Sequence, residues 1–167
     1  VLAPTSRTDC PAPNNSNMLC EYYLTRPAFA LIMLGTNDLE RINNVTTYTD
    51  NLTTIVTQTI NRGIIPVLST IPPRFDNATL GARVAAYNDA VMSVARANNI
   101  PLWDYWYALQ APTLINQGMD PDGIHPSVVM CRGYYTRSTL AAWDWRDGKL
   151  SLRWFFDSDK FGPPDRS

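Results

Sequence analysis

The residues best suited to chemistry lie in two short polar segments that are far apart in the chain. The first is Gly35-Thr36-Asn37-Asp38, which directly follows a run of apolar residues. An asparagine side chain carries two N–H donors, and such donors can stabilise a developing oxyanion. The same residues would also suit a tight turn in which Asn37 caps the next helix. Both interpretations are open from this segment alone.

The second segment covers residues 120–127 and contains His125, the only histidine in the sequence. An imidazole that titrates near neutrality is suited to act as a general base. Asp122 lies three residues earlier and can accept the ring N–H, which would fix the tautomer as a triad acid does. The alternative is an acidic surface turn that carries an incidental histidine.

Alternating strands and helices are expected to position these segments. Continuous apolar runs over residues 28–34, 64–68 and 100–103 predict strands, and the first suits a strand buried on both faces. Apolar residues at helical spacing predict helices over residues 45–60 and 80–94. This order predicts a parallel sheet with helices on both faces. Ligands bind such a sheet at the carboxyl ends of its strands.

The rest of the chain is less regular. We expect an irregular segment over residues 1–17, one domain over residues 18–143 and an aromatic-rich tail over residues 144–167. A further helix is predicted over residues 134–143. Asp147-Gly148 predicts a hairpin turn between short strands.

Composition excludes several classes of partner. The formal net charge of -1 gives no electrostatic case for nucleic acid, and no apolar run approaches the about 20 residues that span a bilayer. The three cysteines are too scattered to predict a metal site. Cys10 and Cys20 could pair in an exported protein, or all three could be independent thiols. The cysteines and the low lysine content favour an extracellular or periplasmic location.

Taken together, Gly-x-Asn-Asp after an apolar strand and Asp-x-x-His-Pro downstream resemble the SGNH (GDSL-like) serine hydrolase family. The resemblance implies a three-layer α/β/α sandwich with a parallel, flavodoxin-like sheet. It implies that Asn37, beside Gly35, is an oxyanion donor and that Asp38 is a structural member of the same block. Asp122 and His125 would complete a catalytic triad. The implied substrate is a small-molecule or carbohydrate ester, with no cofactor and no metal.

The family's Gly-Asp-Ser block, which carries the nucleophile, is absent from this sequence, and no glycine precedes Gly35. We therefore expect an N-terminal truncation that leaves the fold incomplete and this chain inactive. No other residue is a clear substitute for the nucleophile: Ser69 is expected only to end its strand, Ser127 is too close in sequence to His125, and nothing predicts a reactive Cys131. Loss of the family's first strand would leave residues 28–34 with an unpaired apolar edge, which favours self-association.

A non-catalytic domain that binds carbohydrate or acyl groups is the alternative function. Its stacking surfaces would come from a group of aromatic residues near the third strand: Trp103, Tyr105, Trp106 and Tyr107. The ordinary interpretation of these side chains is that they pack in the core, where aromatic burial stabilises small domains.

Overall fold

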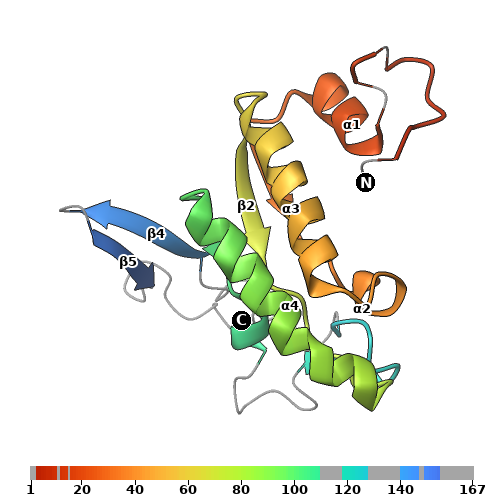
Figure 1. Cartoon of the computed structure of the whole chain (residues 1–167), viewed down its shortest axis with the longest axis vertical. Helices are drawn as coiled ribbons and strands as arrows, with labels where there is room; N and C mark the ends of the chain where they lie inside the picture. Colours follow the sequence, from red (N-terminus) through yellow and green to blue (C-terminus); the bar gives the residue numbers. More distant parts are fainter. Residues whose placement is uncertain are drawn as a thin grey trace, which may run out of the picture.

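The computed structural model describes residues 3–10, 12–14, 16–109, 118–127, 140–146 and 149–154. In chain order the elements are α1 (Asn17–Thr25), β1 (Phe29–Ile32), α2 (Asp38–Arg41), α3 (Val45–Ile60), β2 (Ile65–Ser69), α4 (Ala78–Ala97), β3 (Leu102–Trp103), α5 (Tyr105–Ala108), β4 (Leu140–Arg146) and β5 (Lys149–Trp154). From β1 to β3 the three predicted strands alternate with the two predicted long helices (Figure 1).

The strands form one sheet in the order β1-β2-β3-β4-β5. The three strands predicted from the apolar runs are parallel, with Ile32 paired to Leu68 and Ser69 paired to Trp103. This confirms the α/β class and the parallel sheet. The carboxyl ends of β1, β2 and β3 therefore lie at one edge, where the sequence predicts the ligand site.

The helix predicted over residues 134–143 is wrong where the structure describes it. Residues 140–143 belong to β4, which pairs antiparallel with β3 and then with β5, while residues 134–139 lie outside the described ranges. Tryptophans alternate with other residues in this stretch, and such a pattern suits a strand. The pairing of Arg146 with Lys149 confirms the predicted hairpin, whose turn residues Asp147 and Gly148 lie outside the described residues.

Helices α3 and α4 pack on one face of the parallel strands (Figure 1). Ile32 and Leu68 lie beneath them, in one core with Val56 of α3 and Val91 of α4. The opposite face is different, because three apolar side chains there remain more than half exposed: Phe29 at 66%, Leu31 at 55% and Ile65 at 57%. The expectation that β1 is buried on both faces is therefore wrong among the described residues.

Asparagine side chains define where the two long helices begin. Asn44 accepts the Thr47 N–H at 3.1 Å before α3, and Asn77 accepts the Thr79 N–H at 2.9 Å before α4. These bonds satisfy N–H groups that have no partner within the helix.

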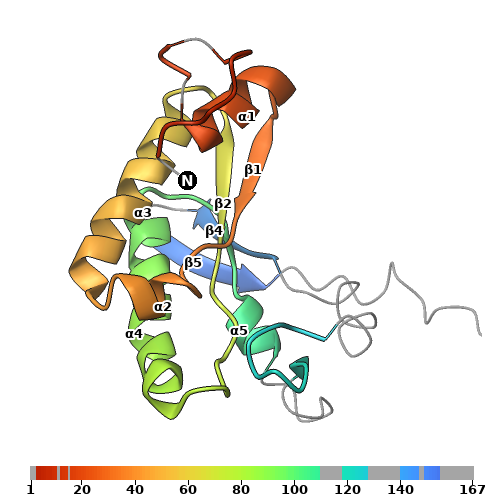
Figure 2. The same cartoon turned by 90° about the vertical axis from the view of Figure 1, so that its right-hand side faces the viewer.

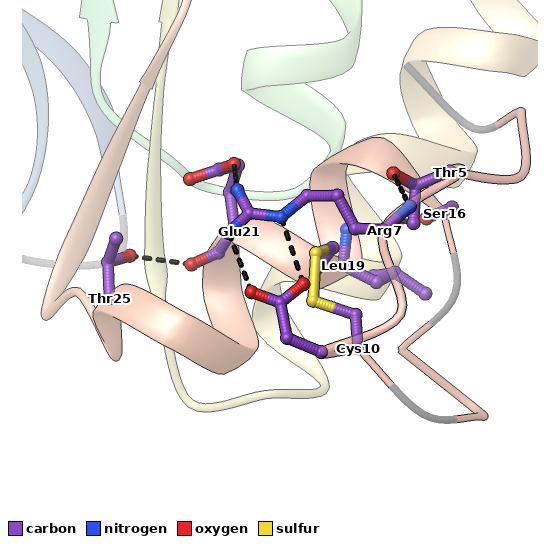
Figure 3. Close-up of a disulfide and its surroundings, with 9 residues drawn as sticks. Thr5, Arg7, Cys10, Ser16, Leu19, Glu21 and Thr25 are labelled. Carbon is purple, nitrogen blue, oxygen red and sulfur yellow. Dashed lines mark hydrogen bonds and ion pairs between the residues drawn. A yellow bond between two sulfur atoms is a disulfide. The ribbon is translucent and has the colours of Figure 1, made fainter.

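The N-terminal segment is fastened to α1 by a disulfide between Cys10 and Cys20, whose Cα atoms are 5.3 Å apart (Figure 3). Of the two alternatives for these cysteines, the structure has the pair. Arg7 reinforces the attachment, because its guanidinium binds Asp9 at 2.8 Å and Glu21 at 3.1 Å. Ser16 caps the helix by accepting the Leu19 N–H at 3.3 Å.

Candidate active site

The predicted site residues lie at the carboxyl edge of the parallel strands. Figure 2 shows α2 and residues 118–127 at the lower end of the molecule, with the N-terminal segment at the opposite end. β1 leads into Gly35-Thr36-Asn37-Asp38, and β2 leads into the loop of residues 70–76. The loop of residues 70–76 contacts both predicted segments.

Asn37 immediately precedes the short helix α2, but its side chain makes no capping hydrogen bond. The residue is exposed, and its backbone is already helical with φ -78° and ψ -24°. The structure therefore does not support the alternative in which Asn37 serves as a helix cap. Its amide group is available to an external acceptor.

The backbone around Asn37 is fixed by donors from three other elements. Tyr and Arg side chains donate to four carbonyl oxygens of residues 34–39. The bonds are Tyr48 to Leu34 at 2.8 Å, Arg74 to Thr36 at 3.1 Å, Tyr87 to Asp38 at 3.4 Å and Arg83 to Leu39 at 3.0 Å. A donor that must meet an oxyanion benefits from such a fixed backbone, since catalysis by preorganised dipoles depends on position.

Gly35 is required by the geometry of this turn. Its φ of +133° is a conformation that residues with side chains rarely adopt. A Cβ atom at this position would also lie 2.9 Å from the Tyr48 hydroxyl. Gly35 thus lets β1 turn sharply beneath Tyr48, and its carbonyl then accepts the Leu39 N–H at 3.0 Å to start α2.

Asp122 and His125 form the arrangement that the sequence predicts for a triad acid and base. Asp122 Oδ2 lies 2.6 Å from His125 Nδ1, and Asp122 Oδ1 accepts the backbone N–H groups of Ile124 at 2.8 Å and His125 at 2.9 Å. The His125 backbone N–H, the His125 ring and the Ile124 N–H together lower the pKa of Asp122 to about 2. At neutral pH this carboxylate can only accept, so we assign the ring proton to Nδ1 and the lone pair of the neutral imidazole to Nε2.

The imidazole is open to an incoming group, because the side chain of His125 is 72% exposed. The two backbone bonds are those of an ordinary Asx turn, and the contact between Asp122 and His125 Nδ1 is the feature that favours a catalytic pair over an incidental surface histidine. Such a fixed ring with an accessible Nε2 can remove a proton from a nucleophile and return it to a leaving group.

The loop of residues 70–76 joins the two predicted segments. Arg74 Nη1 donates to the carbonyl of Thr36, next to Asn37, and the Phe75 N–H donates to the carbonyl of Gly123 at 2.8 Å, next to Asp122. The described residues contain no hydrogen bond between Asn37 and His125 themselves. The structure thus places both segments against one loop, without a direct hydrogen bond between the side chains of Asn37 and His125.

Two serines considered as nucleophiles are poorly suited to that role. Ser69 is 1% exposed, and its hydroxyl donates to the Thr70 carbonyl at 2.9 Å. Ser127 is 7% exposed, and its backbone N–H donates to Gly118 at 2.7 Å. Cys131 lies outside the described residues.

A cavity of about 190 Å³ lies beside the Asn37 segment, between the end of β1 and helices α2 and α3. Its lining combines apolar side chains with three polar groups: Leu34, Asp38, Ile42, Tyr48, Asn51, Leu52 and Ile55. Burial, and to a lesser degree Asp38, raises the pKa of the Tyr48 phenol, so this group stays neutral and donates to Leu34. Neither Asn37 nor His125 lines the cavity, so a substrate bound by both would lie outside it.

The aromatic residues near β3 are mostly packed rather than available for stacking. Tyr105 is 6% exposed and its ring centroid is 5.1 Å from that of Trp103. Trp106 packs against the main core, and Tyr107 is exposed at 57%. This packing matches the ordinary core interpretation for Tyr105 and Trp103.

The described residues contain one cluster with the composition of a metal site, formed by Asp9, Cys10 and Cys20. Both of its sulfur atoms are joined in the disulfide, so this cluster has no thiolate to offer a metal. No helix in the described part of the chain combines the length and the apolar character needed to cross a membrane.

Sequence reasoning missed Arg74 and Asp76 as residues of the site. The loop Pro72-Pro73-Arg74 follows the second strand in the sequence, where an arginine is ordinarily solvated. Its side chain is instead 5% exposed and forms a two-bond ion pair with Asp76 at 2.6 Å for each bond. The carboxylate of Asp76 raises the pKa of Arg74, and Arg74 lowers the pKa of Asp76.

Solved structures with the same fold include known hydrolases. A lipase/acylhydrolase from Enterococcus faecalis has a TM-score of 0.58 at 22% identity, over 72% of this chain and 64% of that chain. Axe2, an acetylxylan esterase from Geobacillus stearothermophilus, has a TM-score of 0.57 at 19% identity, over 73% of this chain and 65% of that chain. At these identities the likeness establishes the fold, and the chain spans about two thirds of each protein's length.

Two curated proteins of Bacillus subtilis match a shorter stretch more closely. The rhamnogalacturonan exolyase YesX is 58% identical over 41 residues, and the rhamnogalacturonan endolyase YesW is 54% identical over 41 residues. Each match covers 25% of this chain and 7% of the relative.

The family profile described as GDSL-like Lipase/Acylhydrolase matches residues 15–130, which include Asn37, Asp122 and His125. That match covers most of the sequence, and the fold agrees with it. The chain therefore belongs to the GDSL-like lipase/acylhydrolase family.

Proposed function

We propose that this protein is a serine ester hydrolase when the chain also includes the family's Gly-Asp-Ser segment. In that form His125 Nε2 removes the proton of the serine hydroxyl as the oxygen attacks the acyl carbonyl. Asn37 donates to the tetrahedral oxyanion, and the protonated His125 returns its proton to the departing alcohol. Water, activated by the same imidazole, then releases the acyl group from the serine.

The observation that carries this proposal is the geometry of Asp122. One of its oxygens accepts two backbone N–H groups, which fixes the carboxylate, and the other lies 2.6 Å from His125 Nδ1. A solvated Asx turn makes the same two backbone bonds, so the contact with the imidazole is the part that supports catalysis. Asn37, whose amide makes no capping bond, supplies the second component of the same chemistry.

Comparing two forms of the protein tests the proposal. The 167-residue chain, which contains no Gly-Asp-Ser, should release acetate from 4-nitrophenyl acetate no faster than its His125→Ala variant. A form extended to include Gly-Asp-Ser should hydrolyse the ester, and His125→Ala should abolish that activity. Robust hydrolysis by the chain alone would mean that the nucleophile has been misplaced, and an inactive extended form would contradict the proposal.

For the substrate we propose an acetyl ester on a plant cell-wall polysaccharide of the rhamnogalacturonan type. Support comes from the stretch shared with two rhamnogalacturonan lyases and from the fold shared with an acetylxylan esterase. Acetate release by the extended form should be faster from acetylated rhamnogalacturonan than from acetylated xylan. Faster release from acetylated xylan would contradict this choice of polymer, but it would not contradict the proposal of ester hydrolysis.

A non-catalytic binding domain is the second candidate, and it differs from the first in needing no serine nucleophile. The packed Trp103 and Tyr105 weigh against a stacking platform built from these rings. Calorimetric binding of an acetylated oligosaccharide by the chain, equal in wild type and in Asn37→Ala, would support this candidate over a hydrolase.

A further inference from the structure

The loop after β2 contains an arginine whose position is unusual for a loop residue. Its side chain is 5% exposed, and Nε and Nη2 both bind the Asp76 carboxylate at 2.6 Å. This two-bond arrangement holds the planar guanidinium in one orientation. The remaining nitrogen, Nη1, then donates to the Thr36 carbonyl at 3.1 Å.

The backbone of the same loop packs closely against residues 122–125, which include His125. The Phe75 N–H donates to the Gly123 carbonyl at 2.8 Å, and Gly123 has a φ of +69°. A Cβ atom on Gly123 would lie only 2.6 Å from the Asp76 nitrogen, so the two backbones meet without room for a side chain. Asp122, which orients His125, is the neighbouring residue.

We propose that Arg74, locked by Asp76, is a positioning residue that fixes the Asn37 segment relative to the Asp122–His125 pair. That Arg74 affects catalysis rests on the proposed function. That Arg74 holds the two segments in place rests on the hydrogen bonds alone. Arg74 acts through its neighbours, since its guanidinium bonds go to Asp76 and to the Thr36 backbone. Lysine cannot replace it, because a single ammonium group cannot make the planar two-bond pair and the third bond together.

Hydrogen exchange of the 167-residue chain tests the structural part. In Arg74→Gln, amides of residues 36–41 and of residues 122–125 should both exchange about tenfold faster, since a buried bond to a charged donor is lost. The matched control is Arg83→Gln, because Arg83 also donates to this segment, at Leu39, from α4. It should speed exchange near residue 39 and leave residues 122–125 unchanged.

Asp76→Asn provides a milder second variant, which keeps the arginine and removes the charge that locks it. It should speed exchange in the same two segments by a smaller factor. Unchanged exchange at residues 122–125 in both variants would overturn the proposal. Acceleration spread evenly over α3 and α4 would also overturn it, because that result means a general loss of stability.

Kinetics in the ester-hydrolysing form separate positioning from stability. Arg74→Gln should lower kcat while KM for a small ester changes less than about threefold, and Asn37→Ala should cost far less in that background than in wild type. Full additivity of the two changes would contradict positioning. If the extended form has no esterase activity, the proposed function fails, and the exchange experiment still decides the structural role.

Discussion

At the scale of single residues, the account depends on two polar side chains whose surroundings differ. Asn37 has an exposed amide on a backbone that other side chains hold in place. His125 has an exposed ring held by one carboxylate. The spacing of Asp122 and His125 was enough to predict their contact, since three residues of a turn allow the carboxylate to fold back. The role of Arg74 could not be predicted, because burial of a loop arginine depends on tertiary packing.

Replacement of Asn37 tests the oxyanion role. In the ester-hydrolysing form, Asn37→Ala should lower kcat by about 10²–10³ with little change in KM, the usual loss for one oxyanion donor. Asn51→Ala is the matched control, because Asn51 lines the neighbouring cavity and has no assigned role. Steady-state kinetics on a soluble acetyl ester give both constants. Equal activities of the Asn37 and Asn51 variants would remove Asn37 from the site.

The low pKa of Asp122 predicts how its pair with His125 depends on pH. A carboxyl whose folded pKa lies below its ordinary value of 3.8 stabilises the fold at higher pH, and this contribution is lost as pH falls through about 2. The carboxyl ¹³C resonance of Asp122 should therefore titrate with a midpoint near 2.

The variant His125→Gln refines this prediction. The backbone N–H groups of residues 124 and 125 remain, so the midpoint should rise but stay below 3.8. Since Asp122 is ionised throughout the usual assay range, an acid limb of activity above pH about 4 belongs to another group. A wild-type midpoint at the ordinary value would contradict the geometry described for Asp122.

At the scale of elements, the alternation of strands and helices was predictable. The spacing of apolar residues and the length of each apolar run distinguish buried strands from amphipathic helices. β1, β2, β3, α3 and α4 follow directly from those patterns. The helix over residues 134–143 was mispredicted, since Leu140 and Ala141 pair with β3 and so begin a strand, and this pairing depends on tertiary contacts. Loop contacts such as that between Gly123 and Asp76 join distant segments, and no local pattern indicates them.

Two glycines with nearly the same backbone conformation allow that contact to be tested. Gly63 has a φ of +70° with open space around it, so Gly63→Ala should cost only the backbone strain, about 1–2 kcal/mol. Gly123 has a φ of +69° and a neighbouring nitrogen 2.6 Å from the added Cβ, so Gly123→Ala should cost about 2–5 kcal/mol. Urea unfolding measures both losses, and equal losses would show that the loop contact is loose.

At the scale of the whole molecule, β1 lies at the edge of the sheet formed by the described residues, and its outer face is apolar and exposed. Unpaired edges and apolar patches of this kind favour association between chains. The resemblance to a family with a further strand predicts an open edge, and the strand order of the described residues, which begins with β1, agrees with it. Phe29 and Leu31 project from the exposed face next to that edge.

We therefore predict concentration-dependent self-association of this chain, measured by sedimentation velocity. Leu31→Glu should shift the chain toward monomer, because it places a charge on the exposed face of β1. Ile60→Glu is the control, since Ile60 is 41% exposed but belongs to α3, which packs on the opposite face of the sheet. A wild-type chain that stays monomeric at high concentration would contradict this prediction.

The most direct measurement is a crystal structure of the ester-hydrolysing form with a phosphonate bound as a tetrahedral adduct. Our account predicts that an adduct oxygen lies about 2.7–3.1 Å from the Asn37 amide nitrogen. It also predicts that His125 Nε2 lies within hydrogen-bond distance of the attacking serine oxygen. An adduct that contacts only one of these two side chains would contradict the claim that Asn37 and His125 act on the same reacting group.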